Sequence, residues 1–101
     1  MSRTMNEHWR AHLRLALLVA LAKDTVGFRA NSSFLKDLLE RGAGFVLTRD
    51  QVRTELAWLA EQGLVTTSEA IEGLVVAVLS ERGGDVASGA ATVPGVQQPG
   101  P

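Results

Sequence analysis

The segment TRDQVRTELAWLAEQGLV, which begins at Thr48, constrains the fold most. Thr48 and Gln51 have the spacing of a capping box, in which two side chains satisfy free amides at a helix start. Apolar residues then recur at helical spacing, at Val52, Leu56 and Leu59. Gly63 can end the helix in a left-handed conformation. The segment therefore predicts a helix with one buried face that begins at Thr48 and stops at Gly63.

The residue pattern changes after Gly63. The runs LVTTS (64–68) and LVVAVL (74–79) are rich in β-branched and aliphatic residues, and the stretch EAIEG between them places Gly73 in a turn. Two such runs joined by a short polar stretch predict an antiparallel hairpin. A capped helix followed by a hairpin limits the chain to the α+β class.

Two further helices are predicted ahead of the capped one. Residues 5–23 carry apolar residues at helical spacing, and NSSFLKDLLERGAG supplies a second helix that Asn31 or Ser32 can cap. Residues 24–30 leave room for a short extended piece between the two. After the hairpin, Ser80 caps a last segment, SERGGDVASG, whose paired glycines predict about one turn of helix. The predicted fold is mainly α with a small antiparallel β-hairpin.

The first helix is apolar on both sides from Leu15 onward. Trp9 and Leu13 belong to one apolar stripe, and further apolar residues lie opposite that stripe. A helix that is apolar all round has to be covered on both sides, and a small domain can use a second subunit for this purpose. We therefore predict a homodimer whose interface contains Leu15, Leu18, Val19 and Ala22.

Charge and cysteine content limit the classes of function. The chain has 101 residues, enough for one domain, and its net charge of −1 gives no overall attraction to nucleic acid. A DNA-binding surface would have to be a local patch. The sequence has no cysteine, which excludes disulfides, thiolate metal sites and cysteine nucleophiles.

Two other classes of function have weak signals. His8 and His12 have a spacing that can bind a divalent metal, but no further cluster completes a site, so we expect no metal and no cofactor. No pairing of nucleophile and base is visible, and we do not expect an enzyme. The run LALLVALA at residues 15–22 ends like a signal peptidase site, but it is much shorter than the ~20 residues that span a bilayer. We expect an uncleaved helix, no membrane contact and a cytoplasmic protein.

The predicted order of helix, short strand, helix, helix and hairpin is that of a winged helix-turn-helix. LTRDQVRTELAWLAEQGLV resembles the third helix of ArsR-type winged-helix regulators, and LSERG is similar to a junction common in such regulators. GFRANSSFL, VRTELAWLAEQGLV and the terminal VPGV resemble a small winged-helix (ArsR-like) protein family encoded in Mu-like phages and prophages. This resemblance covers nearly the whole chain. It implies a DNA-binding transcriptional regulator in the cytoplasm of a bacterial host.

In a winged helix that reads DNA, the first half of the third helix enters the major groove. The resemblance therefore predicts a site for double-stranded DNA here. Its expected base readers are Arg49, Asp50, Arg53 and Thr54, and Thr48 and Gln51 are expected near the phosphates. Arg53 is the strongest base reader, because a guanidinium matches the guanine edge and this position points away from the buried stripe. The alternative for Arg53 is an ion pair with Asp50 or Glu61.

Acidic residues argue against DNA binding. From Asn31 to Gly63 the chain has four basic and five acidic residues, and the hairpin turn carries Glu69 and Glu72 where a DNA-gripping wing would have Lys or Arg. Phosphate contacts elsewhere would depend on the fold and on three arginines, Arg10, Arg14 and Arg29. The alternative function is a winged-helix module for protein-protein interaction that binds a phage or host protein and no DNA.

The C-terminal segment differs in composition from the rest. From Val86 onward no residue is charged, and the three prolines Pro94, Pro99 and Pro101 lie among glycines. Residues 1–89 are predicted to form the winged-helix domain and residues 90–101 a flexible Pro/Gly-rich tail. The alternative is that VPGV, with Val93 and Val96, lies extended along the body or along a partner.

Overall fold

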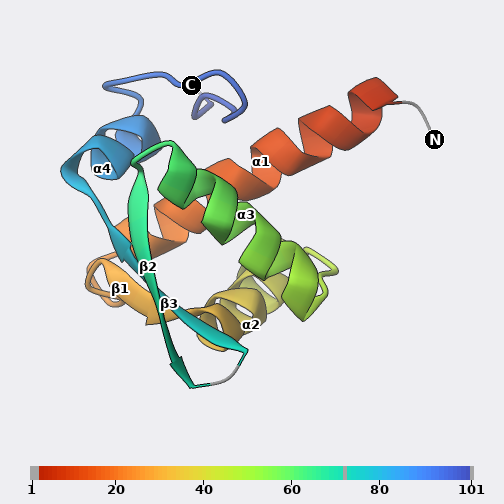
Figure 1. The fold of residues 1–101 in the computed structure, drawn as a ribbon. Coiled ribbons are helices and arrows are strands. Elements are labelled where there is room, and N and C mark those ends of the chain that lie inside the picture. Colours follow the sequence, from red (N-terminus) through yellow and green to blue (C-terminus); the bar gives the residue numbers. More distant parts are fainter. Residues whose placement is uncertain (1–2, 72, 101) are drawn as a thin grey trace.

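The computed structural model describes residues 3–71 and 73–100 of the chain (Figure 1). The elements in chain order are α1 (Arg3–Ala22), β1 (Arg29–Asn31), α2 (Ser32–Ala43), α3 (Arg49–Glu61), β2 (Val65–Ile71), β3 (Leu74–Leu79) and α4 (Glu81–Ser88). Over the described residues, four helices and a three-stranded antiparallel sheet confirm the predicted α+β class.

The sheet has the strand order β1-β3-β2, so β3 is central. β2 and β3 pair as the predicted antiparallel hairpin, with Val65 opposite Leu79. β1 pairs antiparallel with the other edge of β3, so the short piece expected within residues 24–30 becomes a third strand. This pairing brings the start of α2 close to β3, where the Ser32 hydroxyl accepts a hydrogen bond from the Val75 amide at 3.1 Å.

The core lies where α1, α2 and α3 pack together over the sheet. The inward face predicted for α3 is confirmed, because Val52, Leu56 and Leu59 have no exposed surface. α1 supplies four fully buried leucines: Leu13, Leu17, Leu18 and Leu21. Each such burial contributes ~1.5–3 kcal/mol. Although α1 is rich in leucine, no helix within the described residues is long and apolar enough to cross a bilayer.

Side-chain caps fix the starts of α2 and α3. Asn31 Oδ1 accepts the Phe34 amide at 2.7 Å. Thr48 Oγ1 accepts the Gln51 amide at 3.1 Å, and Gln51 Oε1 accepts the Thr48 amide at 2.8 Å, which confirms the predicted capping box. Gly44, with φ 73°, ends α2 in the left-handed conformation. The connection between α2 and α3 is therefore defined at both of its ends.

The last helix is longer than its glycines suggest. The sequence predicts about one turn of helix, but α4 has 8 residues and is capped by Ser80, whose hydroxyl accepts the Gly83 amide at 3.0 Å. A Cβ atom on Gly83 would lie 2.0 Å from the Leu64 carbonyl oxygen. The prediction was wrong because Gly83 does not end the helix. Its missing side chain instead lets α4 pack closely against the backbone at the start of the hairpin.

The second apolar side of α1 is covered within the same chain. Leu15 and Leu18 are buried, and α1 packs extensively against α4. Of the other two residues assigned to a dimer interface, Ala22 is half-buried and Val19 keeps 38% of its surface exposed. A second subunit is therefore not needed to cover Leu15 and Leu18. Of the four residues predicted for the interface, Val19 has the most exposed apolar side chain. The homodimer itself stays a prediction.

The C-terminal segment lies on the body of the domain over residues 90–100. Val93 and Val96 are buried, and the Gln97 amide donates to the Ala11 carbonyl of α1 at 3.2 Å. Of the two arrangements that the sequence leaves open, the structure has the packed one, as a turn rather than an extended strand. Composition predicts mobility because Pro, Gly and Ala bury little surface, whereas the two valines of this segment are buried in the structure.

Candidate functional site

The candidate site is the first half of α3 together with its cap. All six residues predicted to bind DNA lie on this surface and are exposed: Thr48, Arg49, Asp50, Gln51, Arg53 and Thr54. Their placement follows from the capping box and from the buried stripe, which turns the opposite face of α3 to solvent. The structure therefore brings the predicted residues together on one exposed surface.

Two of these residues have a structural task. The side chains of Thr48 and Gln51 are hydrogen-bonded to each other's backbone amides in the capping box. Their cap bonds hold the start of α3 in place, and the Gln51 side-chain oxygen is already engaged. The remaining four residues carry the chemistry that this surface can offer to a ligand.

Arg53 takes part in a weak ion pair. Its Nη1 atom lies 3.8 Å from Asp50 Oδ1, and the two side chains are 42% and 91% exposed. An exposed pair at this distance contributes little and can open for a competing ligand. The alternative pairing with Asp50 is therefore present in the structure, but it leaves the Arg53 guanidinium accessible.

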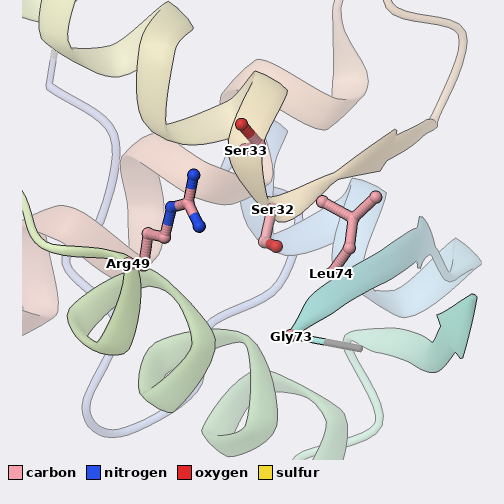
Figure 2. Close-up of a pocket in the computed structure, with 5 residues that line it drawn as sticks. All are labelled: Ser32, Ser33, Arg49, Gly73 and Leu74. Carbon is pink, nitrogen blue, oxygen red and sulfur yellow. The ribbon is translucent and has the colours of Figure 1, made fainter. Parts of the chain in front are cut away.

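Arg49 points in a different direction. It lines a small pocket of about 120 Å³ with Ser32, Ser33, Gly73 and Leu74. Figure 2 shows the Arg49 side chain extending from the first turn of α3 toward the first turn of α2, while Gly73 and Leu74 border the pocket from the hairpin. Among the residues that the structure describes, no carboxylate forms an ion pair with Arg49.

The pocket combines features that suit an anion. A guanidinium, a serine hydroxyl and the N-terminal turn of α2 all border it, and helix N-termini attract negative charge. Sequence reasoning placed Arg49 on the surface but missed Ser32 and Ser33 as its neighbours. The signal was present in the run NSSF, which was assigned only a capping role.

The inward side of α3 carries a second set of charges. Glu55 is 3% exposed, and its carboxylate accepts hydrogen bonds from Arg10 Nε and Arg14 Nε, each at 2.7 Å. The Arg14 guanidinium also lies over the Trp58 ring, 3.8 Å from its centroid. Arg10 and Arg14 are therefore engaged with α3, whereas Arg29 is exposed on β1. Of the three arginines considered for phosphate contacts, Arg14 is buried and Arg10 is half-buried.

The charges of α2 are also paired along the helix. Lys36 Nζ lies 2.9 Å from Glu40 Oε1, and Arg41 Nε lies 3.1 Å from Asp37 Oδ1. The other Glu40 oxygen accepts the Leu47 amide at 3.1 Å, which ties α2 to the connection before α3. The hydrogen bonds from Lys36 and from the Leu47 amide hold the pKa of the Glu40 carboxyl below its usual value of 4.5.

The hairpin turn uses one of its acids internally. Glu69 Oε2 accepts the Gly73 amide at 2.9 Å, so this carboxylate stabilises the turn. Glu72, the other acid expected in the turn, lies outside the described residues.

On the opposite flank of α3, Asp50 and Thr54 border a hollow of about 280 Å³ that α1 closes with Asn6 and Arg10.

Both histidines lie on α1 and not on the first half of α3. His12 packs against Phe45, with ring centroids 5.6 Å apart. Over the parts of the chain that the structure describes, no group of three or more His, Cys, Asp and Glu side chains is arranged to hold a metal ion.

Comparison with known proteins places the chain in a family. Over 72 residues the chain is 49% identical to uncharacterized protein gp26 of Escherichia phage Mu, a match that covers 71% of this chain and 73% of that protein. The chain belongs to the phage Mu gp26 family. A further member, an uncharacterized protein of Haemophilus influenzae, is 41% identical over 69 residues, which are 68% of this chain and 65% of that protein.

Membership of the gp26 family agrees with the phage origin expected from the sequence motifs. No protein-family model and no solved structure matches the chain. The names of the two relatives assign no activity.

Proposed function

We propose that this member of the gp26 family is a winged helix-turn-helix protein that binds double-stranded DNA and regulates transcription in a Mu-like phage. In this proposal α2 and α3 form the helix-turn-helix, and β2 with β3 forms the wing. The observation that carries the proposal is the pocket at which the starts of α2, α3 and β3 meet around Arg49. A phosphate of the DNA backbone fits this chemistry.

The two arginines have different roles in the proposed complex. Arg49 and Ser33 would contact one backbone phosphate, which positions α3 without reading sequence. Arg53, one helical turn further on, would exchange its weak pair with Asp50 for the edge of a guanine in the major groove. Positioning and sequence reading would thus belong to separate side chains of α3.

The charges that α2 and α3 expose favour DNA binding more than the number of acids and bases in their sequence indicates. Glu55 is neutralised by Arg10 and Arg14, and the acids of α2 are paired with Lys36 and Arg41. The charges left on the exposed first half of α3 are Arg49, Asp50 and Arg53. This patch is locally cationic although the whole chain is not, which supports a small DNA contact.

A gel shift with duplexes from the phage's own promoter regions tests the proposal, beginning at low salt. Binding that weakens as salt rises is expected, because phosphate contacts release counterions. Arg53→Ala should weaken binding, while Arg41→Ala, an equal change of charge on an exposed and already paired arginine of α2, should change it little. Absence of binding at low salt, where phosphate attraction is greatest, contradicts the proposal.

The rival proposal is a winged-helix module that binds a phage or host protein. Exposed apolar side chains near the candidate site favour it, since Ile71 at the hairpin tip is 67% exposed and Phe34 in the first turn of α2 is 47% exposed. The same gel shift separates the two, because the rival requires no response to DNA at any salt concentration.

We propose in addition that the regulator acts as a homodimer, since two-fold symmetric proteins bind two half-sites on DNA. Val19 lies at an apolar groove of about 250 Å³ between α1 and α2, which also includes Ala16 and Leu38. Light scattering at micromolar concentration tests the dimer, and Val19→Asp should shift the mass to that of one chain. A monomeric mass for the unmodified protein contradicts it.

A further inference from the structure

The run VPGV near the C-terminus forms a tight turn. The Val96 amide donates to the Val93 carbonyl at 3.1 Å, and Gly95 has φ 95°. A type II turn needs a positive φ at its third position, which glycine provides, and proline is common at its second position. The two valines that flank the turn are buried, at 5% and 8% exposure. We refer to residues 93–96 as the C-terminal turn.

The C-terminal turn packs against both α1 and α3. Arg14 Nη1 of α1 donates to the Gly95 carbonyl at 2.9 Å. A Cβ atom on Gly95 would lie 2.7 Å from Trp58 Cζ2, so the glycine backbone lies directly on the indole of α3. Just after the turn, the Gln97 amide donates to the Ala11 carbonyl of α1 at 3.2 Å. The turn therefore contacts the two helices on which Arg14 and Glu55 form their buried ion pair.

Arg14 is the point at which these contacts meet. The guanidinium bonds Glu55 through Nε, bonds Gly95 through Nη1 and stacks over Trp58. Its side chain is 10% exposed and that of Glu55 is 5% exposed. A buried ion pair repays the cost of its desolvation only when its geometry is good and its remaining donors and acceptors are also satisfied. The C-terminal turn supplies an acceptor for Arg14 and covers part of the Trp58 ring.

We propose that the C-terminal turn is a latch that holds α3 against α1. With the latch closed, the Arg14–Glu55 pair is buried and α3 is fixed from behind. With the latch open, water reaches Arg14 and Trp58, and α3 becomes mobile while the sheet stays folded. Under the proposed function, and resting on it, the latch also fixes the direction in which Arg49 and Arg53 face a partner.

Gly95→Ala tests the latch with a single added carbon. The substitution is strained at φ 95° and collides with the Trp58 ring, so it should lift the turn from α3. Gly100→Ala is the matched control, because a Cβ there meets no atom within 4 Å. A second variant, Val96→Ser, weakens the buried anchor of the turn without changing glycine geometry.

Two measurements report on the latch without DNA. In a Trp9→Phe background, Trp58 is the remaining tryptophan of the two in the chain, and its emission should shift to the red in Gly95→Ala and Val96→Ser but not in Gly100→Ala. Amides of α3 should exchange with solvent at least about tenfold faster in the two latch variants, while those of β2 and β3 keep their protection.

Three outcomes overturn the latch. They are an unchanged Trp58 emission in both latch variants, an equal effect from Gly100→Ala, and a uniform loss of protection over the helices and the sheet. The last would make the turn a general stabilising element. None of these readouts depends on DNA, so failure of the latch and failure of the proposed regulator remain distinguishable.

Discussion

The two faces of α3 carry similar side chains in opposite environments. On the inward face, Glu55 is bound by Arg10 and Arg14 and is almost completely buried. On the outward face, Arg53 Nη1 lies 3.8 Å from Asp50 Oδ1, and the two side chains are 42% and 91% exposed. The inward charges are fully engaged and hold the helix in place, whereas the outward charges are available to a ligand. The number of acids and bases along a helix therefore does not give the charge that the helix offers to a ligand, because that charge depends on the face on which each residue lies.

The largest expected effect concerns the inward face. Glu55→Ala leaves the buried Arg14 without its carboxylate and should lower the free energy of unfolding by about 3–5 kcal/mol. Urea unfolding measures this loss. Asp50→Ala removes an acid from the outward face of the same helix and should stay within about 0.5 kcal/mol. Similar losses for the two variants would show that the faces do not differ as described.

Substitutions on the outward face of α3 should change the affinity for DNA and leave the free energy of unfolding nearly unchanged. Arg53→Ala should weaken binding to a cognate duplex by about 1–3 kcal/mol and relax the sequence preference. Arg49→Ala should weaken binding to all duplexes alike. It should also reduce by about 1 the slope of the logarithm of the binding constant against the logarithm of the salt concentration. Fluorescence anisotropy at several salt concentrations measures both effects. The division of roles fails if Arg49→Ala changes the sequence preference as Arg53→Ala does.

The boundary between the faces can be tested at the helix cap. Thr48→Ala removes the acceptor of the Gln51 amide and should cost about 1 kcal/mol of stability. Thr54→Ala, an equivalent change on the exposed face, should cost less than about 0.5 kcal/mol. Thermal unfolding of the two variants gives the comparison, and equal midpoints would mean that the capping box contributes nothing.

The smallest effect should come from the partly buried hydrogen bonds of Glu40 in α2. The folded-state pKa of Glu40 is lowered, so its carboxylate contributes stability above the ordinary value of 4.5 and loses it as the pH falls through the folded pKa. Glu40→Gln should therefore melt slightly below the unmodified protein at neutral pH, and the difference should shrink as the pH falls from neutral to below 4.5. A constant difference across this range would place its cause outside the Glu40 charge.

Much of the architecture could be predicted from local patterns. The capping box, the inward stripe of α3 and the hairpin were predicted from residue spacing, because each depends on neighbours within a few positions. The six proposed DNA contacts were placed on one exposed surface for the same reason. The length of α4 was predicted wrongly because Gly83 makes a contact with a residue distant in the sequence. Its missing side chain leaves room for the Leu64 carbonyl.

The candidate site was predicted only in part. Arg49 was expected at the surface, but its pocket requires β3 to lie beside the start of α2, and that pairing joins segments more than 40 residues apart. The assignment of Glu55 to the interior could not be foreseen either. A glutamate between two apolar positions of a helix is buried only if arginines from another helix reach it.

Local sequence patterns were enough to predict the capped start of α3, the hairpin and the side of α3 that faces the core, because caps and apolar periodicity act over short distances. Tertiary structure alone decided which charges remain available. It paired Glu55 with Arg10 and Arg14, placed the C-terminal turn on Trp58, and left Arg49 and Arg53 exposed. The reason is physical. The burial and pairing of a charge depend on residues distant in the chain, which only the packed fold brings together.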